Sequence, residues 1–318
     1  MDDIDLKSLF SSTTEFEAVA STFTVKNIMN PLDYFDITNY GKSDLDSDFL
    51  LTMFEEDVKS RFVVIIDDGM VIGVKDLYDD WEIDYEGYED LLKKHGDRKN
   101  IPFKEFHNIV DILINKVISS DFRLIDLFPL LIREDYLLVL EKNSLSGYIT
   151  FSDLDKMPVK LSLFALLLEF EANISSKLRK IENLDAYLVL LSDSSINKIK
   201  RMVKIQKRLR KQSAKEEITI NLETGESEEV DENKISSYEA IKYLNIEEKQ
   251  FLLREYLSKE HPLTDEYIAL MDDIFKLIKS VRNLIAHGDS ILEELEDPTR
   301  LEFLLTALLK LNELYEKL

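Results

Sequence analysis

Residues 135–155 read DYLLVLEKNSLSGYITFSDLD and residues 61–80 read RFVVIIDDGMVIGVKDLYDD, and these two stretches decide the fold. Each contains an aromatic residue, four aliphatic residues, a short polar turn and a second apolar run that leads into a glycine. The glycine follows the aromatic residue by eleven positions in both copies, from Phe62 to Gly73 and from Tyr136 to Gly147. Four successive aliphatic residues bounded by turn residues are typical of a buried strand. The sequence therefore predicts a strand–turn–strand unit that occurs twice.

A helical pattern precedes each predicted strand pair. The two patterns are LDSDFLLTMFEEDVKS (45–60) and FHNIVDILINKVISS (106–120). The stretch between the copies, 78–100, is acidic and poorly patterned, so we expect an irregular connection there. Residues 1–157 are thus predicted to form one domain in which helices accompany a duplicated pair of strands.

Three features of this first half carry a family resemblance. They are the opening FTVKNIMNP (23–31), the paired aliphatic strands, and a Gly-x-x-Thr-x-x-Asp ending made by Gly147, Thr150 and Asp153. The first copy keeps Gly73 and Asp79 but has Asp76 where a hydroxyl residue would be expected. Together these features resemble a tandem pair of CBS domains, which bind adenine nucleotides.

The resemblance implies a regulatory nucleotide site of the AMP, ADP or ATP type. Its residues would be Gly147, Thr150, Asp153 and Asp79, with Asp153 accepting hydrogen bonds from the ribose hydroxyls and Thr150 contacting a phosphate. A vicinal diol offers two donors and a carboxylate only accepts, so the pairing is chemically sound. Asp76 would repel phosphate, which implies one competent site and one degenerate site. The alternative is that Thr150 and Asp153 only cap the helix that follows.

The second half, 158–318, is predicted to be an all-α bundle. PVKLSLFALLLEFEANISSKLRKI begins at Pro158 and is apolar almost all round, so that helix must be covered on several sides. A later helix over 265–286 would bury Tyr267, Met271, Ile274, Ile278, Val281 and Ile285, and a final helix would begin after Asp297. EEITINLETGESEEV (216–230) interrupts the helices and favours a β-hairpin insertion. The predicted fold class is therefore α+β in the first half and all-α in the second.

One helix of the second half is strongly basic although the chain carries a net charge of −23. INKIKRMVKIQKRLRKQSAK (196–215) holds nine basic residues and no acidic residue, with Ile196, Ile199, Val203 and Ile205 as its expected apolar stripe. A net negative charge repels nucleic acid at long range, so RNA binding would have to use this helix. We hypothesise that its RNA contacts are Lys200, Arg201, Lys204 and Arg208. The alternative is a solvated charged face without a ligand.

The stretch VRNLIAHGDS (281–290) ends the helix over 265–286 and raises the question of catalysis. A helical bundle whose late helix carries Arg282 and Asn283, followed by His287, resembles the HEPN family. That resemblance implies a homodimer in which two such motifs meet and cleave RNA without a metal. Arg282, Asn283 and His287 would then be the catalytic residues. The alternative is that Arg282 and His287 satisfy carbonyls at the helix end, since cations and a following glycine suit that position.

The implied chemistry is metal-free RNA cleavage. The 2′-hydroxyl would attack the adjacent phosphorus and leave a 2′,3′-cyclic phosphate and a 5′-hydroxyl. An imidazole can move the proton, and a guanidinium can neutralise the phosphoryl oxygens in the transition state. Five residues on a straight helix separate two side chains by about 140°, so Arg282 and His287 converge only if the helix ends near Ala286 or a second subunit supplies one group.

Composition excludes several other classes of function. The chain has no cysteine, so disulfide frameworks and thiolate metal sites are excluded. His95, His107 and His261 show no metal-ligand spacing, and we expect no metal site and no catalytic cofactor. The acidic start MDDIDLK is not typical of a signal peptide, and the longest apolar run is too short to cross a bilayer. We expect a cytoplasmic protein without membrane contact.

Two functions remain open from the sequence. The first is an endoribonuclease with a toxin, stress or antiviral role, regulated by adenine nucleotide bound to the CBS-like pair. The second is a non-catalytic nucleotide-sensing dimer that serves as a scaffold or docks a partner. The sequence does not indicate the RNA target, the sign of regulation or the presence of an antitoxin.

Overall fold

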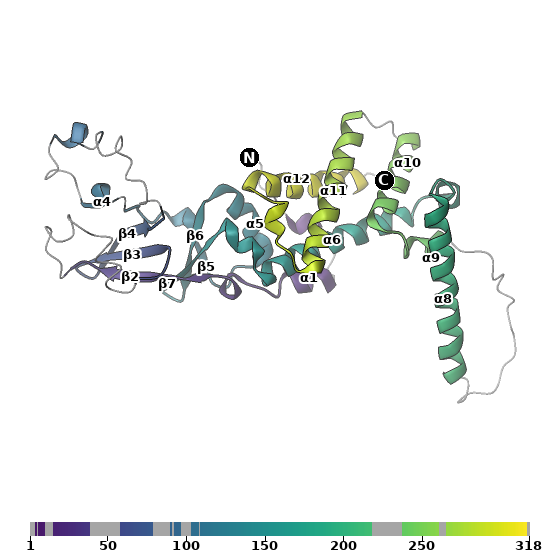
Figure 1. Ribbon diagram of the computed structural model, residues 1–318, viewed down its shortest axis with the longest axis horizontal. Helices are drawn as coiled ribbons and strands as arrows, with labels where there is room; N and C mark the ends of the chain where they lie inside the picture. The colour runs from purple at the N-terminus through teal and green to yellow at the C-terminus, as the bar shows by residue number, and fades with distance from the viewer. Residues whose placement is uncertain are drawn as a thin grey trace. The chain divides into compact units, whose positions relative to one another are not determined.

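A computed structural model describes residues 4, 6–9, 15–38, 58–78, 90, 92–96, 103–107, 109–217, 237–260 and 265–316 of the 318-residue chain (Figure 1). The chain divides into two compact units. The α/β unit is Ser21–Ser162, and the helical unit combines Met1–Ala20 with Leu163–Leu318. The sequence placed the boundary at 157/158 and assigned the first residues to the α/β unit, whereas they belong to the helical unit.

The α/β unit contains two sheets built on the duplicated strand pair. One sheet has the order β1-β7-β6-β5 and the other has the order β2-β3-β4. The strands are β1 (Asn30–Pro31), β2 (Asp33–Asp36), β3 (Phe62–Asp67), β4 (Met70–Asp76), β5 (Val117–Ser119), β6 (Tyr136–Glu141) and β7 (Ser144–Thr150). Hairpins β3–β4 and β6–β7 are antiparallel, and each is extended by a parallel strand, β2 or β5. The predicted duplication is confirmed, down to a register shift at Ile65/Ile66 and its counterpart at Val139/Leu140.

A glycine in each hairpin marks a close approach by another backbone segment. A Cβ on Gly147 would lie 2.6 Å from the carbonyl oxygen of Asn30 in β1. A Cβ on Gly73 would lie 2.6 Å from the carbonyl oxygen of Val110, which pairs with Val74 through two backbone hydrogen bonds of 2.8 and 2.9 Å. Real Cβ atoms do not approach an oxygen so closely, so both positions require glycine for space rather than for conformation.

The expected helix over 106–120 is wrong. The structure has α4 (Phe103–Phe106), an isolated bridge at Val110, a 3-10 turn η4 (Ile114–Lys116) and then strand β5. Val110 and Val117–Ser119 use their backbone groups to extend the two sheets. Ile109 and Ile118 are buried, whereas Leu113 and Ile114 are exposed. The helix of the second copy is α5 (Leu124–Arg133), which follows β5. The matching pattern over 45–60 lies outside the described residues except for its last three, which are not helical.

The helical unit confirms the predicted run of helices. Its elements are η1 (Leu6–Leu9), α1 (Glu15–Ala20), α6 (Met157–Leu178), α7 (Leu184–Leu188), α8 (Asp193–Glu217), α9 (Ser237–Ile241), α10 (Ile246–Glu260), α11 (Asp265–His287), η6 (Ile291–Glu293) and α12 (Pro298–Glu316). In the predicted hairpin, 216–230, the first two residues belong to α8 and the others lie outside the described residues.

The core of this unit forms around α6. The ring of Phe170 on α6 lies 6.0 Å from that of Phe275 on α11 and 6.2 Å from that of Tyr315 on α12. Met271, Ile274, Ile278, Val281 and Ile285 on α11 are buried as expected, and the side chain of Tyr267 lies outside the described residues.

The first residues of the chain join the helical unit through η1. Leu6 and Leu9 are buried, α12 packs on η1, and the Asn173 amide on α6 donates to the Leu9 carbonyl at 2.9 Å. Asp297 accepts from the backbone N–H of Thr299 and Arg300 and caps α12, as the sequence predicts. None of the described helices is long and apolar enough to cross a membrane.

Replacing Gly147 by alanine tests the close approach of β1 and β7. The added methyl group would force the Asn30 carbonyl away, and we expect a loss of about 1–3 kcal/mol in the free energy of unfolding. Urea unfolding measures the change. Ser144→Ala, at an exposed position of the same strand, is the control and should be nearly neutral. Equal stability of the two variants would contradict this packing.

Candidate functional site

Backbone hydrogen bonds cap the C-terminal end of helix α11, and the side chains of Arg282 and His287 do not take part. Gly288 has a positive φ of 79°, and its N–H donates to the Ile285 carbonyl at 3.2 Å. The N–H of Asp289 donates to the Leu284 carbonyl at 2.9 Å. These two bonds form a Schellman motif, which satisfies terminal carbonyls without any side chain. The capping alternative for Arg282 and His287 is therefore not what holds this helix end.

Arg282 has a partner on another helix. Its Nη1 lies 3.2 Å from Oε2 of Glu171 on α6, and the other carboxylate oxygen of Glu171 lies 2.7 Å from Nζ of Lys249 on α10. The side chains of Arg282, Glu171 and Lys249 are 35%, 15% and 8% exposed, respectively. One carboxylate thus holds two cations from two helices, and Arg282 is the cation that reaches solvent.

Asn283 and His287 lie on a different face of α11. They are four residues apart, so they share one side of the helix, and both are exposed. The His287 side chain makes no hydrogen bond or ion pair in the described part of the chain, since its surroundings are solvent. These two residues therefore have no evident role in holding the fold.

One copy of the chain does not bring Arg282 and His287 together. Helix α11 ends at His287, one residue beyond Ala286, so Arg282 and His287 both lie within the helix. Five residues of regular helix place the two side chains about 140° apart and roughly 7.5 Å apart along the axis. The convergence within one chain that the sequence left open is absent, and only a second copy could complete the pair.

Glu171 and Lys249 were not singled out by the sequence analysis. A signal was present, because two glutamates interrupt the apolar run of α6 in LLLEFEANIS. The first of them, Glu169, is 2% exposed, and its Oε2 has no hydrogen-bond partner among the described residues. Carboxylates inside an apolar helix call for a polar partner on a neighbouring element, which a single sequence does not identify.

Thr150 ends strand β7 and Asp153 follows it, at the proposed nucleotide site. The Asn30 amide donates to both oxygens of Asp153 at 3.0 Å, and Lys156 Nζ lies 2.9 Å from Oδ1. The backbone N–H of Thr150 donates to Oδ2 at 2.7 Å. The carboxylate is 5% exposed, so its acceptor sites are used by protein donors. The capping alternative is thus present in the structure, together with a link from Asp153 to β1.

The first copy differs at the equivalent place. The Asp76 carboxylate takes the guanidinium of Arg61 through bonds of 3.0 and 2.7 Å and accepts from the Tyr78 N–H at 3.0 Å. An Arg–Asp pair therefore occupies the position where a hydroxyl would contact phosphate. Asp79, the predicted ribose partner, lies outside the described residues.

Helix α8 carries the predicted RNA-binding residues. Lys200, Arg201, Lys204 and Arg208 are exposed and form no ion pair in the part of the chain that the structure describes. The expected apolar stripe is partly wrong. Ile199 and Val203 are buried, but Ile196 is only half-buried and Ile205 is 39% exposed. Helix α9 is a neighbour of α8.

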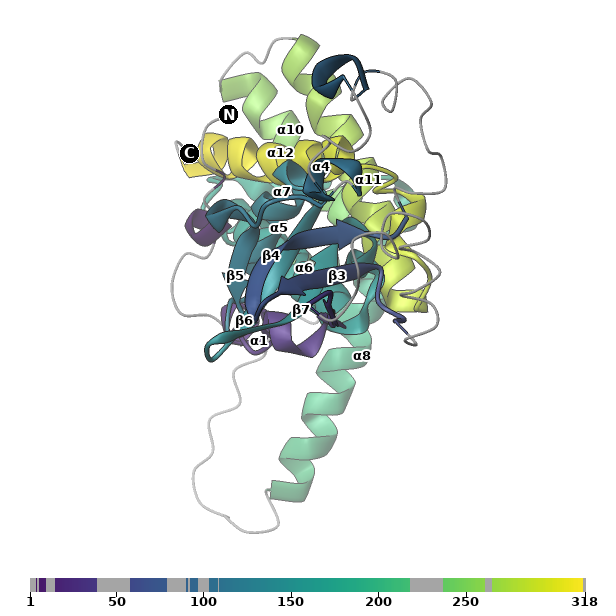
Figure 2. The ribbon, with the colours of Figure 1, turned by 90° about the vertical axis from the view of Figure 1, so that its left-hand side faces the viewer.

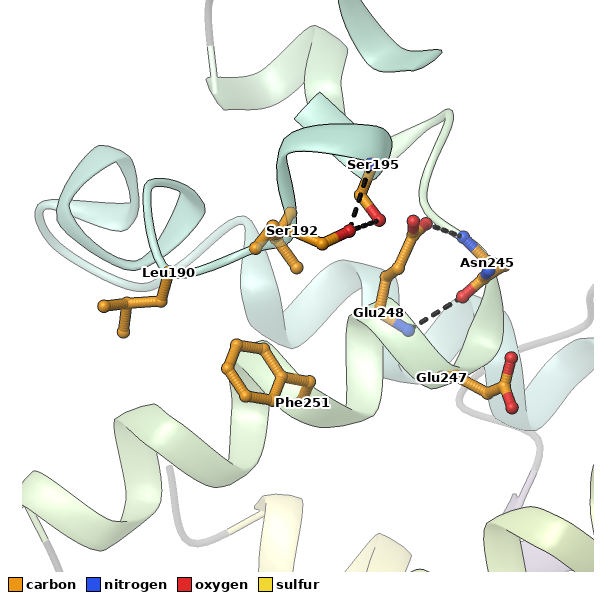
Figure 3. A pocket seen from close by; sticks show the side chains of 8 residues that line it. Leu190, Ser192, Ser195, Asn245, Glu247, Glu248 and Phe251 are labelled. Atoms are coloured by element: carbon orange, nitrogen blue, oxygen red, sulfur yellow. Dashed lines mark hydrogen bonds between the residues drawn. The ribbon is translucent and has the colours of Figure 1, made fainter. Parts of the chain in front are cut away.

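A pocket of about 350 Å³ lies at the start of α8 and α10 (Figure 3). Its polar groups bond to one another. Asn245 N–H donates to Glu248 Oε2 and Glu248 N–H donates to Asn245 Oδ1, both at 2.8 Å, and the Ser192 and Ser195 hydroxyls lie 3.0 Å apart. These are capping contacts. None of the predicted site residues lines the pocket.

Of the other histidines, the structure describes His95 and His107, and neither belongs to a catalytic grouping among the described residues. His95 Nε2 lies 3.0 Å from Glu105, which also bonds Lys94 at 2.7 Å, and His261 lies outside the described residues. The ring of His107 packs 4.5 Å from that of Phe103. Within the described ranges, no group of three or more His, Cys, Asp or Glu side chains could hold a metal ion.

Comparisons with known proteins give little further guidance. No family model matches the sequence, and no curated protein matches it. Among solved structures, the chain is similar to a conserved CBS domain protein of unknown function from Thermoplasma acidophilum. The two are 16% identical, and the similarity covers 46% of this chain and 75% of the other, with a TM-score of 0.28. Similarity at this level does not by itself establish a family.

Replacing Glu171 by alanine tests the ion cluster. The change leaves Lys249 as a nearly buried cation without its carboxylate, and we expect a loss of about 2–3 kcal/mol in the free energy of unfolding. That value is below the cost for a fully buried pair because Glu171 keeps some solvent contact. Urea unfolding measures it, with the exposed Glu182→Ala as control. A neutral Glu171→Ala would show that Lys249 does not need this partner.

Proposed function

We propose that this protein is a metal-independent endoribonuclease whose activity is regulated by an adenine nucleotide. In this proposal, two copies of the chain form one composite site from Arg282, Asn283 and His287. The proposal rests on the resemblance of the helical unit to the HEPN family and on one observation about α11. That observation is the exposure of Asn283 and His287 beside a helix end that the backbone already satisfies.

The chemistry follows from the three side chains. The imidazole of His287 would accept the proton of the 2′-hydroxyl as that oxygen bonds to phosphorus, and a protonated imidazole would give a proton to the 5′-oxygen as its bond to phosphorus breaks. The guanidinium of Arg282 would bind the phosphoryl oxygens, which carry the charge of the transition state. Asn283, on the same face as His287, would orient a phosphate oxygen through its amide. Arg282 comes from one copy and His287 from the other, because they are on different faces of the same helix.

Arg282 must exchange partners for this reaction. Its guanidinium is held by Glu171 at 3.2 Å, so an incoming phosphate competes with that carboxylate. The exchange is less costly than it would be for an isolated pair. Glu171 keeps Lys249 at 2.7 Å when Arg282 leaves, so neither Glu171 nor Lys249 becomes a buried unpaired charge.

Regulation is assigned to the α/β unit. Its duplicated strand hairpins and its Gly147, Thr150 and Asp153 support a nucleotide site of the CBS type. Ribose hydroxyls would replace the Asn30 amide and Lys156 as donors to Asp153, since the carboxylate is already saturated. A ligand that releases Asn30 would act on β1, and this gives nucleotide binding a structural consequence inside the unit.

A non-catalytic, ligand-responsive scaffold is the second candidate. Two observations favour it: Glu171 already binds Arg282, and Asp153 already has a full set of protein donors. Under this alternative both groups are structural, and the helical unit serves only to associate with another chain.

Incubation of the purified protein with a fluorescent RNA in EDTA tests the nuclease. Wild type should produce fragments with 2′,3′-cyclic phosphate and 5′-hydroxyl ends. His287→Ala should reduce the cleavage rate by at least about a hundredfold, because it removes the proton-transfer group. Lys276→Ala, on the same exposed side of α11, is the control. A wild type that is inert with and without AMP, ADP and ATP would favour the scaffold.

Calorimetric titration with AMP, ADP and ATP tests the nucleotide site. We expect binding by wild type and at least about tenfold weaker binding by Thr150→Val, which keeps the shape of the side chain but removes the hydroxyl. Ser152→Ala, beside Thr150, is the control for local disturbance. If Thr150→Val binds the nucleotide as tightly as Ser152→Ala and wild type do, Thr150 is not part of the site.

A further inference from the structure

Helix α8 presents an exposed apolar strip. Met202, Ile205 and Leu209 are 40%, 39% and 57% exposed, and their spacing of three and four residues puts them on one side of the helix. The helix packs elsewhere, through the buried Ile199 and Val203, and its C-terminal half runs beyond the neighbouring helices of the unit (Figure 1 and Figure 2). Three aliphatic side chains in a row on one exposed side are typical of a protein interface.

The four unpaired cations lie beside this strip. Lys200, Arg201, Lys204 and Arg208 occupy the adjoining side of α8, at about 100° per residue around the axis. All four are exposed, and in the described ranges none of them has a carboxylate partner. A surface of this kind fits a partner that offers carboxylates next to apolar groups.

The chain itself carries an acidic surface, with the half-buried Leu292 beside its carboxylates. The connection between α11 and α12, residues 288–299, reads GDSILEELEDPT and contains five acidic residues and no basic residue. Glu293 and Glu296 are exposed and form no ion pair in the described part of the structure. We propose that the exposed face of α8 docks on a second copy of this chain, against the acidic connection at 289–297.

The apolar strip decides between a protein partner and RNA. Phosphate groups would pair with the cations, but they would leave Met202, Ile205 and Leu209 in water. A protein interface covers aliphatic groups and uses charged groups at its edge to fix orientation. In a chain with a net charge of −23, another copy also supplies the negative field that attracts a basic helix.

The docking affects the proposed cleavage site but does not depend on it. The acidic connection begins at Asp289, two residues after His287, and its charge would repel an RNA phosphate. When α8 of the second copy docks there, its cations offset that negative charge. The same contact places the second copy beside His287, as a composite site requires. A dimer that ignores the α8 charge changes would overturn the docking and leave the cleavage proposal standing, and a dimer that uses α8 but does not cleave RNA would do the reverse.

A charge exchange between two variants tests the interface. Sedimentation velocity should show a wild-type dimer that weakens at high salt. Lys204→Glu combined with Arg208→Glu should weaken dimerisation at least about tenfold, and Glu293→Lys combined with Glu296→Lys should do the same. An equal mixture of the two double variants should recover a dimer, because opposite charges then face each other again. Met202→Ser combined with Leu209→Ser should weaken the dimer at low salt and at high salt alike, because it removes apolar contacts that salt does not screen.

The control is Lys242→Glu with Lys310→Glu, which changes the net charge equally at exposed positions outside α8. It should leave the dimer intact. A wild type that stays monomeric at tens of micromolar overturns the proposal, and so does a mixture that fails to recover the dimer. Loss of binding to a labelled RNA by the α8 charge variant, with unchanged sedimentation, would identify the strip as an RNA surface instead. Circular dichroism confirms that each variant is folded.

Discussion

The Glu171 carboxylate, shared by Arg282 and Lys249, is the interaction on which the helical unit and its candidate site depend. It joins α6, α10 and α11 at one point, at distances of 3.2 and 2.7 Å. Burying one carboxylate is tolerated because two cations surround it. The two cations differ in exposure. Lys249 is nearly enclosed, whereas Arg282 keeps about a third of its side chain in solvent. A cation so placed is fixed in position yet remains able to meet an anion from outside.

The geometry of α11 keeps the Arg282 and His287 side chains of one chain apart. The backbone of Gly288 ends α11 one residue beyond His287, so regular helix extends across the whole motif. Two side chains five residues apart on regular helix face different directions, whatever their chemistry. Any function that needs both groups together must therefore involve two copies of the chain. In the docking that we propose, the exposed cations of α8 and the acidic connection after α11 supply the opposite charges for such an association.

The α/β unit depends on close packing at two glycines. Gly147 and Gly73 occupy equivalent places in the two hairpins, and each faces a carbonyl oxygen of another segment. Asp153 then ties the end of β7 to Asn30 in β1, so the strand that crosses Gly147 is also the strand that the carboxylate holds. In the first copy, an Arg61–Asp76 pair occupies the position that corresponds to Thr150. The two copies thus differ in chemistry where their second hairpin strand ends. Only the second copy has a hydroxyl residue, Thr150, near its aspartate.

The sequence by itself determined the duplicated strand pairs, the run of later helices and the buried side of α11, because these follow from local periodicity and turn residues. It could not determine that 106–120 forms strand and turn, since backbone pairing with β4 and β6 overrides a helical pattern. Nor could it identify Glu171 and Lys249 as the partners around Arg282, or the side of α8 that stays exposed. These depend on which elements meet in space, and a single sequence does not record contacts between residues that are far apart along the chain.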